Sequence, residues 1–286
     1  MNVLKGIGLA LLSFILFISL IAFGVGYTVN SVPLNPHYYS KTLNNVNISQ
    51  TIEDTLDELN TDIGISADLQ TEIFNTLKKT EPVIKQRIDI FIEGILTYTK
   101  NKNSTTDLRS TLSDSFINTE FIAELLENID ISKLASAFIT EQNGAGDNSA
   151  DVFTDSFIDT IDSIEPSLKE QVVNLSDPVF KYLLHETAAI DLKTEIRKTL
   201  LSNDFLIEVI DKFDLTDIIS DILKEEIGEE LPGDIDYSEK IDSLADTAES
   251  YFKQQLSSAA GDIADYVLGI KPDLNITLSI DTAIPN

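Results

Sequence analysis

Cysteine and tryptophan are absent from this chain of 286 residues, and basic side chains are scarce. Without cysteine the chain forms no disulfide, offers no thiolate nucleophile and has no Cys ligand for zinc or an iron–sulfur cluster. Lys and Arg number 20, of which three are Arg, against 48 Asp and Glu, so the formal net charge is −28. Proteins bind nucleic acids, which are polyanions, mainly through Lys and Arg, so this charge excludes a nucleic-acid partner.

Charged side chains are also missing from residues 6–36. Within this stretch Gly6–Val29 is mainly apolar, and a hydrocarbon core of about 30 Å needs roughly 20 helical residues to cross it. Lys5 precedes the run, and positive charge favours the cytoplasmic side. Residues 1–30 are therefore predicted to be a single-pass transmembrane anchor in the cell membrane. It contacts the bilayer through residues 6–29, with a cytoplasmic N-terminus and an extracytoplasmic C-terminal domain.

A cleaved signal peptide is the alternative for the same segment. The small residues Ala22, Gly24 and Gly26 would suit a signal peptidase. However, the apolar region of a signal peptide is usually about 7 to 15 residues long. The run in this chain is longer, so the retained anchor is favoured.

The part of the chain after residue 30 repeats one pattern of residue types three times. An aromatic residue is followed by Asn or Asp, a branched aliphatic residue and Ser or Thr, and later by Glu, Lys and Tyr. The offset is 84 residues, apart from one residue lost inside the first copy, and such a period is typical of tandem modules. We predict three tandem units, here called copies 1, 2 and 3, at residues 31–114, 115–198 and 199–286. The matching positions are Tyr38, Asn47–Ser49, Glu81, Lys85 and Tyr98; Phe121, Asp130–Ser132, Glu165, Lys169 and Tyr182; and Phe205, Asp214–Thr216, Glu249, Lys253 and Tyr266.

Apolar residues within each copy recur at the spacing of an α-helix. In copy 1 a wide stripe predicts a long buried helix face; it comprises Val83, Ile84, Ile88, Phe91, Ile92, Ile95 and Leu96. Copy 2 has Pro178 in the corresponding helix, where the missing backbone donor predicts a break or kink. Leu274–Ile280 alternates like a strand, whereas residues 107–112 and 188–196 fit either structure. The predicted fold class is mainly α, with short strands at the ends of the copies left open.

Short segments at both ends of the domain resemble those of uncharacterised extracytoplasmic helical proteins that carry an N-terminal membrane anchor. The opening segment is Leu34–Tyr39, and the closing segment is Tyr266–Gly269 followed by the alternating run Leu274–Ile280. The resemblance implies a place outside the membrane and no particular chemistry.

The polar residues form no recognisable catalytic group. His37 and His185 lie outside any metal-binding or triad spacing, so a surface or hydrogen-bonded role is expected for both. Ser250 and Lys253 match the spacing of a Ser/Lys nucleophile. This Lys, however, belongs to the repeated Glu-x-x-x-Lys pattern, whose simplest interpretation is an ion pair on one face of a helix.

Two sets of repeated polar residues have structural interpretations. Asn47, Asp130 and Asp214 each precede a helical apolar pattern, where a short polar side chain accepts the free N–H groups of the first turn. Tyrosines 98, 182 and 266 end long apolar stripes. They are expected to pack with the hydroxyl group at the surface.

An acid-rich stretch at residues 225–239 was considered for a metal ion. It lacks the alternating acids, central Gly and closing Glu of an EF-hand loop, so a solvated acidic face is the simpler interpretation. No cofactor is predicted, and weak association with Ca²⁺ is kept as the alternative. The candidate ligands are Glu225, Glu226, Glu229, Glu230, Asp234 and Asp236.

These features predict a non-enzymatic structural, adhesive or binding module of the cell envelope, whose partner is an envelope or extracellular protein. Two alternatives stay open. A protein that binds lipid or another apolar ligand would enclose a continuous cavity between apolar stripes. A carboxylate-dependent hydrolase would place two acids across a cleft and separate their pKa values.

Overall fold

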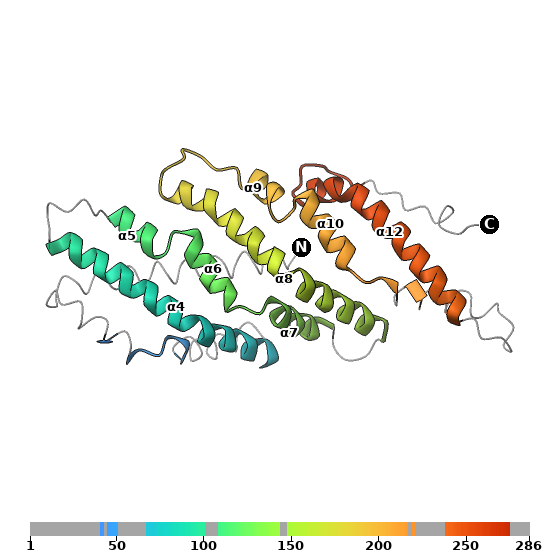
Figure 1. The fold of residues 1–286 in the computed structure, drawn as a ribbon, viewed down its shortest axis with the longest axis horizontal. Coiled ribbons are helices and arrows are strands. Elements are labelled where there is room, and N and C mark those ends of the chain that lie inside the picture. The colour runs from blue at the N-terminus through green and yellow to red at the C-terminus, as the bar shows by residue number, and fades with distance from the viewer. Residues whose placement is uncertain are drawn as a thin grey trace. The chain divides into compact units, whose positions relative to one another are not determined.

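The computed structural model describes residues 41–42, 45–50, 67–100, 108–143, 148–216, 219–220 and 238–274, which are mainly helical and include no strand. The prediction of a mainly α fold is therefore confirmed. The two segments that fitted either structure contain helices, whereas Leu274–Ile280 lies outside the described residues apart from Leu274. The helices are α4 (Ala67–Lys100), α5 (Leu108–Ser115), α6 (Thr119–Glu127), α7 (Ile131–Asn143), α8 (Asn148–Leu183), α9 (Leu192–Lys198), α10 (Asn203–Lys212) and α12 (Ser238–Val267) (Figure 1).

The chain forms two compact bodies. The first body comprises Met1–Asn47 and Ile84–Phe116, and the second comprises Ile48–Val83 and Ile117–Asn286. Helix α4 contributes residues to both bodies. The predicted boundaries between copies, after residues 114 and 198, stay a prediction.

The apolar stripe of α4 forms the described core of the first body. Phe91 in this stripe packs on Phe116, with ring centroids 5.7 Å apart. Thr111 of α5 comes so close to Gly94 that a Cβ added there would lie 2.4 Å from Thr111 Cγ2. The side chains of the stripe that are at most 5% exposed are Ile84, Ile88, Phe91, Ile92 and Leu96. The burial predicted for this face is therefore confirmed at these positions.

In the second body α8 packs against α10 (Figure 1). The Thr160 hydroxyl of α8 donates to the carbonyl of Lys212 at 3.4 Å, and the Ser167 hydroxyl donates to the Glu208 carboxylate at 2.6 Å. The sequence rises along α8 where it falls along α10, so the two helices run antiparallel.

Helix α12 packs against the same helix α10. The Lys253 ammonium donates to the carbonyl of Asp211 at 3.0 Å. Two and a half turns further along α12, a Cβ on Gly261 would lie 3.5 Å from Asn203 Oδ1, at the start of α10. This pair is antiparallel as well, so α8 and α12 run parallel and their C-terminal ends lie on the same side of the second body.

Helices α6 and α10 begin with the same kind of cap. Asn118 and Ser202, which are 84 residues apart, accept a hydrogen bond from the backbone N–H of Phe121 and Phe205 at 2.8 and 3.3 Å. Both phenylalanine side chains are buried. A side-chain acceptor at this position satisfies one of the N–H groups that a helix start leaves free.

The long helices α8 and α12 end with one backbone motif. After α8, Glu186 N–H bonds to the carbonyl of Lys181 at 2.8 Å. After α12, Ile270 N–H bonds to the carbonyl of Asp265 at 2.8 Å. In each case the preceding residue has positive φ, namely His185 at 55° and Gly269 at 65°. This is a Schellman motif, whose left-handed position suits glycine because it has no Cβ.

Helix α8 continues through Pro178, so the predicted break is wrong. Proline removes one backbone hydrogen bond and crowds the preceding turn. The Ser176 hydroxyl bonds to the carbonyl of Val173 one turn earlier, and α8 packs against α6, α7, α9 and α10. We attribute the continuity to this packing, which outweighs the loss of one backbone bond.

None of the helices in the described part of the chain is long and apolar enough to cross a membrane. Residues 6–29, which carry the predicted anchor, lie outside the described residues.

The left-handed backbone at His185 leads to a stability prediction. His185→Gly should stabilise the protein by about 0.5–1 kcal/mol, because glycine adopts positive φ without the steric cost of a Cβ. Gly269→Ala, the matched change at the equivalent position, should destabilise it by about 1 kcal/mol. Urea denaturation followed by circular dichroism measures both. Destabilisation by both substitutions would contradict the prediction.

Candidate functional site

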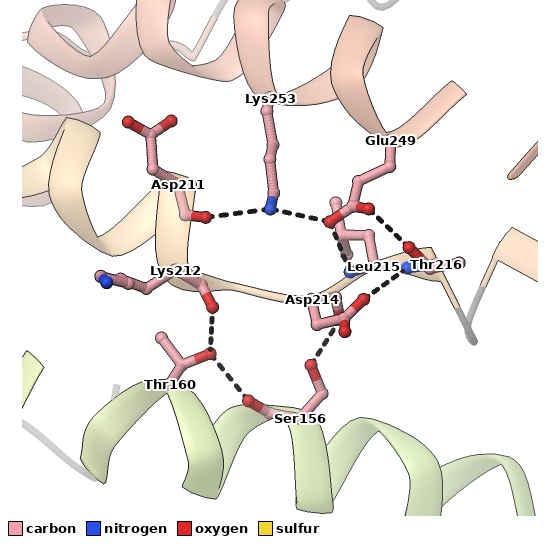
Figure 2. A network of polar contacts seen from close by, with 9 residues as sticks. All are labelled: Ser156, Thr160, Asp211, Lys212, Asp214, Leu215, Thr216, Glu249 and Lys253. Carbon is pink, nitrogen blue, oxygen red and sulfur yellow. Dashed lines mark hydrogen bonds and ion pairs between the residues drawn. The ribbon is translucent and has the colours of Figure 1, made fainter. Parts of the chain in front are cut away.

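A network of polar contacts joins α12 to the chain that follows α10 (Figure 2). Glu249 of α12 accepts the backbone N–H of Leu215 on Oε1 at 3.1 Å and the Thr216 hydroxyl on Oε2 at 2.5 Å. The Lys253 ammonium lies 2.7 Å from Oε1 of the same carboxylate and donates to the carbonyl of Asp211. One carboxylate therefore binds both its own helix and the start of a short helical segment 33–34 residues earlier in the chain.

The same network extends to α8 (Figure 2). Asp214 accepts the N–H of Thr216 at 2.9 Å, and its carbonyl accepts the Ser156 hydroxyl of α8. Thr160, one turn further along α8, donates to the carbonyl of Ser156 at 2.7 Å and to that of Lys212. The segment after α10 is thus held on one side by α12 and on the other by α8.

Glu165 of α8 makes equivalent contacts in copy 2. Its Oε2 accepts the backbone N–H groups of Ile131 and Ser132 at 3.1 and 3.2 Å, at the start of α7. The Lys169 ammonium lies 2.5 Å from Oε1. In copies 2 and 3 the Glu side chain is 15% exposed and the Lys side chain 22% exposed, so both pairs lie in similarly sheltered surroundings.

Glu81 of α4 makes these contacts in copy 1. Its Oε1 accepts the N–H of Ile48 at 3.2 Å, and its Oε2 accepts the N–H and the hydroxyl of Ser49 at 3.1 and 2.5 Å. Ile48 and Ser49 are both buried. We name each of these three arrangements a carboxylate clasp, defined by Glu81, Glu165 or Glu249 and the pair of residues whose N–H or O–H groups it accepts.

The clasp solves a local problem of helix starts. The first N–H groups of a helix have no partner within that helix and carry a partial positive charge. A carboxylate is the strongest side-chain acceptor for them, and its negative charge interacts favourably with the helix dipole. In the clasp this carboxylate comes from another helix, so it joins two helices as well as capping one.

Electrostatics differ between the two acids at each helix start. Burial raises the pKa of Glu249, but hydrogen bonds from Lys253, Thr216 and the N–H of Leu215 outweigh burial and hold that pKa below its ordinary value. Asp130, at the start of α7, has its pKa lowered to about 2, mainly by the hydrogen bond from Lys133, whose ammonium lies 2.7 Å away. Both groups are therefore carboxylates at neutral pH.

Several predicted roles agree with this geometry. The ion pairs Glu165–Lys169 and Glu249–Lys253 are confirmed. Capping is confirmed for Asp130, which accepts the N–H of Lys133 at 3.0 Å, and for Asp214. Asn47 directly precedes the helical residues 48–50, and its capping role stays a prediction.

The bond from each Glu to a distant helix start was not predicted. The signal available was the nearly constant spacing of 34 or 35 residues between Asn47 and Glu81, between Asp130 and Glu165, and between Asp214 and Glu249. A local interpretation already accounted for the Glu and Lys residues. For that reason nothing in the sequence required a longer-range partner.

The described polar residues have structural partners in place of catalytic ones. The Lys253 ammonium is bound by Glu249 and by the carbonyl of Asp211, which gives no support to the Ser/Lys pattern with Ser250. His185 is exposed, lies at the end of α8 and has Nδ1 3.2 Å from the carbonyl of Leu183. Its expected surface role is confirmed, whereas His37 lies outside the described residues.

Within the described ranges no group of His, Asp and Glu is arranged to hold a metal ion. The six candidate Ca²⁺ ligands fall in residues 221–237, which lie outside these ranges. Weak binding of Ca²⁺ to that segment stays a prediction.

The clasp in copy 3 predicts a pH-dependent loss of stability. Glu249→Ala should cost about 1–3 kcal/mol at pH 7, because it leaves sheltered N–H and O–H groups without an acceptor. The pKa of Glu249 is lower in the folded state than its ordinary value of 4.5. Its contribution is therefore complete above that value and is lost as pH falls through the lower, folded pKa. Urea denaturation between pH 7 and pH 3 should show the cost of the substitution shrinking with acidity.

The matched control is Asp246→Ala, since Asp246 is an exposed acid on the same helix. Its cost should stay within about 0.5 kcal/mol at every pH. Equal costs for both substitutions, or a cost of Glu249→Ala that ignores pH, would contradict the role of the clasp.

The ion pair at the start of α7 makes a second prediction. An NMR titration of the Asp130 carboxyl group should give a pKa near 2, and Lys133→Ala should raise it toward the ordinary 3.8. Lys181→Ala, which removes a different exposed ion pair, should leave it unchanged. The stability contributed by Asp130 is present above 3.8 and is lost as pH falls toward 2. An Asp130 pKa that ignores the loss of Lys133 would refute this assignment.

No protein-family model, curated protein or solved structure matches this chain. What it does must therefore be inferred from its own residues and their geometry.

Proposed function

We propose that this protein is a membrane-anchored structural or binding module of the cell envelope, without enzymatic activity. In this proposal residues 1–30 are the anchor, and three tandem copies of one helical unit lie on the extracytoplasmic side. The partner of the module is another envelope or extracellular protein.

The recurring carboxylate clasp is the observation that supports this proposal best. The chain uses the same acid three times to bind the start of a short helix, through Glu81, Glu165 and Glu249. The helix caps at Asn118 and Ser202 and the helix ends at His185 and Gly269 recur at the same offset of 84 residues. These repeated polar residues have a use in joining helices, which favours a scaffold of tandem units over a single catalytic site.

Packing of the apolar stripe favours a module over a carrier of apolar ligands. In α4 the stripe residues Ile88 and Leu96 are each 1% exposed, and Phe91 contacts Phe116. A carrier needs a continuous cavity lined by such residues. Here they contact other side chains instead.

The anchor is supported by the sequence alone. Gly6–Val29 is long enough to cross a bilayer as a helix and carries no charge, and Lys5 precedes it. The chain beyond residue 30 carries nearly all of the net negative charge, and this strongly acidic part lies on the extracytoplasmic side in the proposal.

Cysteine labelling tests the anchor and its orientation. Because the chain has no Cys, a membrane-impermeant maleimide would report only an introduced one. In intact cells Ser250→Cys, at an exposed site on α12, should be labelled, whereas Asn2→Cys should be labelled only after lysis. Both variants should stay with the membrane fraction through an alkaline wash.

Two outcomes would overturn the anchor. Mass spectrometry that finds a mature N-terminus between Val25 and Ser31 would favour a secreted protein. Labelling of Ser250→Cys only after lysis would reverse the proposed orientation.

A further inference from the structure

Exposed apolar side chains of the second body gather at the ends of its long helices. Of the eight large hydrophobic side chains described as exposed in this body, seven lie in residues 182–192 and 266–274, and the eighth is Phe157. The repeated tyrosines Tyr182 and Tyr266 are 44% and 46% exposed. We name this surface the tyrosine end and define it by Tyr182, Leu183, Leu192, Tyr266, Val267 and Ile270.

These residues lie on one side of the second body. Helices α8 and α12 run parallel, so their C-terminal ends point in the same direction. Helix α9 connects the two ends, because it packs against α8 and its Arg197 donates to Asp265 of α12 at 3.1 Å. Next to Leu192, the Lys193 ammonium would lie 4.0 Å from a Cβ on Gly269.

The charge of these segments differs from that of the rest of the chain. Residues 97–110, 181–198 and 265–274, at and just after the ends of the three long helices, hold eight of the 20 basic residues but six of the 48 acidic ones. Several acids around the tyrosine end are also paired, as in Lys181–Asp177, Lys198–Glu195 and Lys271–Asp262. The three segments together carry a net charge of +2 in a chain of −28.

We propose that the tyrosine end rests on the surface of an anionic lipid bilayer. Tyrosine is enriched where membranes meet water, because its ring is apolar and its hydroxyl is polar. Lys and Arg nearby attract anionic headgroups, whereas the strongly acidic remainder of the chain is repelled by them. A helix dipole accounts for cations at helix ends, but it does not account for the uncovered tyrosine, leucine, valine and isoleucine side chains beside them.

The first body has the same kinds of residue at the corresponding positions. Tyr98 and Leu108 are 44% and 50% exposed, and Arg109 follows Leu108. The inference rests on the proposed function in one respect, namely that the anchor brings these ends within reach of the bilayer.

Fluorescence of the full chain in vesicles tests the inference. Val267→Cys, in the tyrosine end, carries a single NBD dye. Gln254→Cys, exposed on α12 thirteen residues earlier, is the matched control about 20 Å away along the helix. With phosphatidylglycerol in the vesicles, the dye at position 267 should shift its emission to the blue and be quenched by nitroxide lipids, whereas the dye at 254 should report water.

Lipid charge and ionic strength separate this surface from the anchor. In vesicles of phosphatidylcholine alone, the blue shift at position 267 should be smaller. Raising the salt from 0.1 to 1 M shortens the Debye length from about 10 to about 3 Å and should reduce the shift in anionic vesicles. In the dye-labelled chain, the double substitution Tyr182→Glu and Leu192→Glu should also reduce it, since both side chains belong to the same surface.

Each outcome has a distinct meaning. Flotation with neutral vesicles reports the anchor, and the dye at position 267 reports the tyrosine end. If the chain floats but the dye at 267 reports water in both lipids, the inference is wrong and the anchor stands. If the chain floats only with anionic vesicles and the dye shifts, the anchor is wrong and the inference stands. A shift in detergent that grows with protein concentration would identify a second copy as the occupant and overturn the inference.

Discussion

One glutamate carboxylate, bound to the first N–H or O–H groups of a short helical segment, is the contact on which the described fold depends. The short segment begins on a polar edge that needs an acceptor, and the acceptor comes from the middle of a long helix. Glu165 and Glu249 each hold a Lys ammonium as well, which offsets part of the cost of sheltering a charge. The negative charge faces the positive end of the helix dipole, where it is most favourable.

This contact couples local structure to the packing of whole helices. A cap made by a neighbouring residue, as by Asn118 or Ser202, forms as soon as its own turn forms. A clasp forms only when a helix some 33 residues later has come into place. In copy 3 the clasped segment is also bonded to α8 through Ser156, so the same few residues join copy 2 to copy 3.

The sequence predicted the parts of this design that have a local cause. Helical spacing located the buried stripe of α4, and the i,i+4 rule located the Glu–Lys pairs. What it missed depends on tertiary context. Pro178 stays inside a helix that is packed by its neighbours, and His185 occupies a left-handed position that its equivalent fills with Gly269. The distant partner of Glu249 is invisible to any window shorter than the loop that it closes.

The distribution of exposed residues adds a constraint on orientation. Helices α8 and α12 expose the same face, with exposed positions at 155, 159, 162, 166, 170 and 174 that recur 84 residues later. On α8 this face carries Asp155, Asp159, Asp162 and Glu170, whose repulsion keeps such surfaces soluble and apart from one another. The helix ends carry exposed tyrosines and cations instead. A chain with repelling sides and one amphipathic end has a single favourable way to meet an anionic surface, which is with that end.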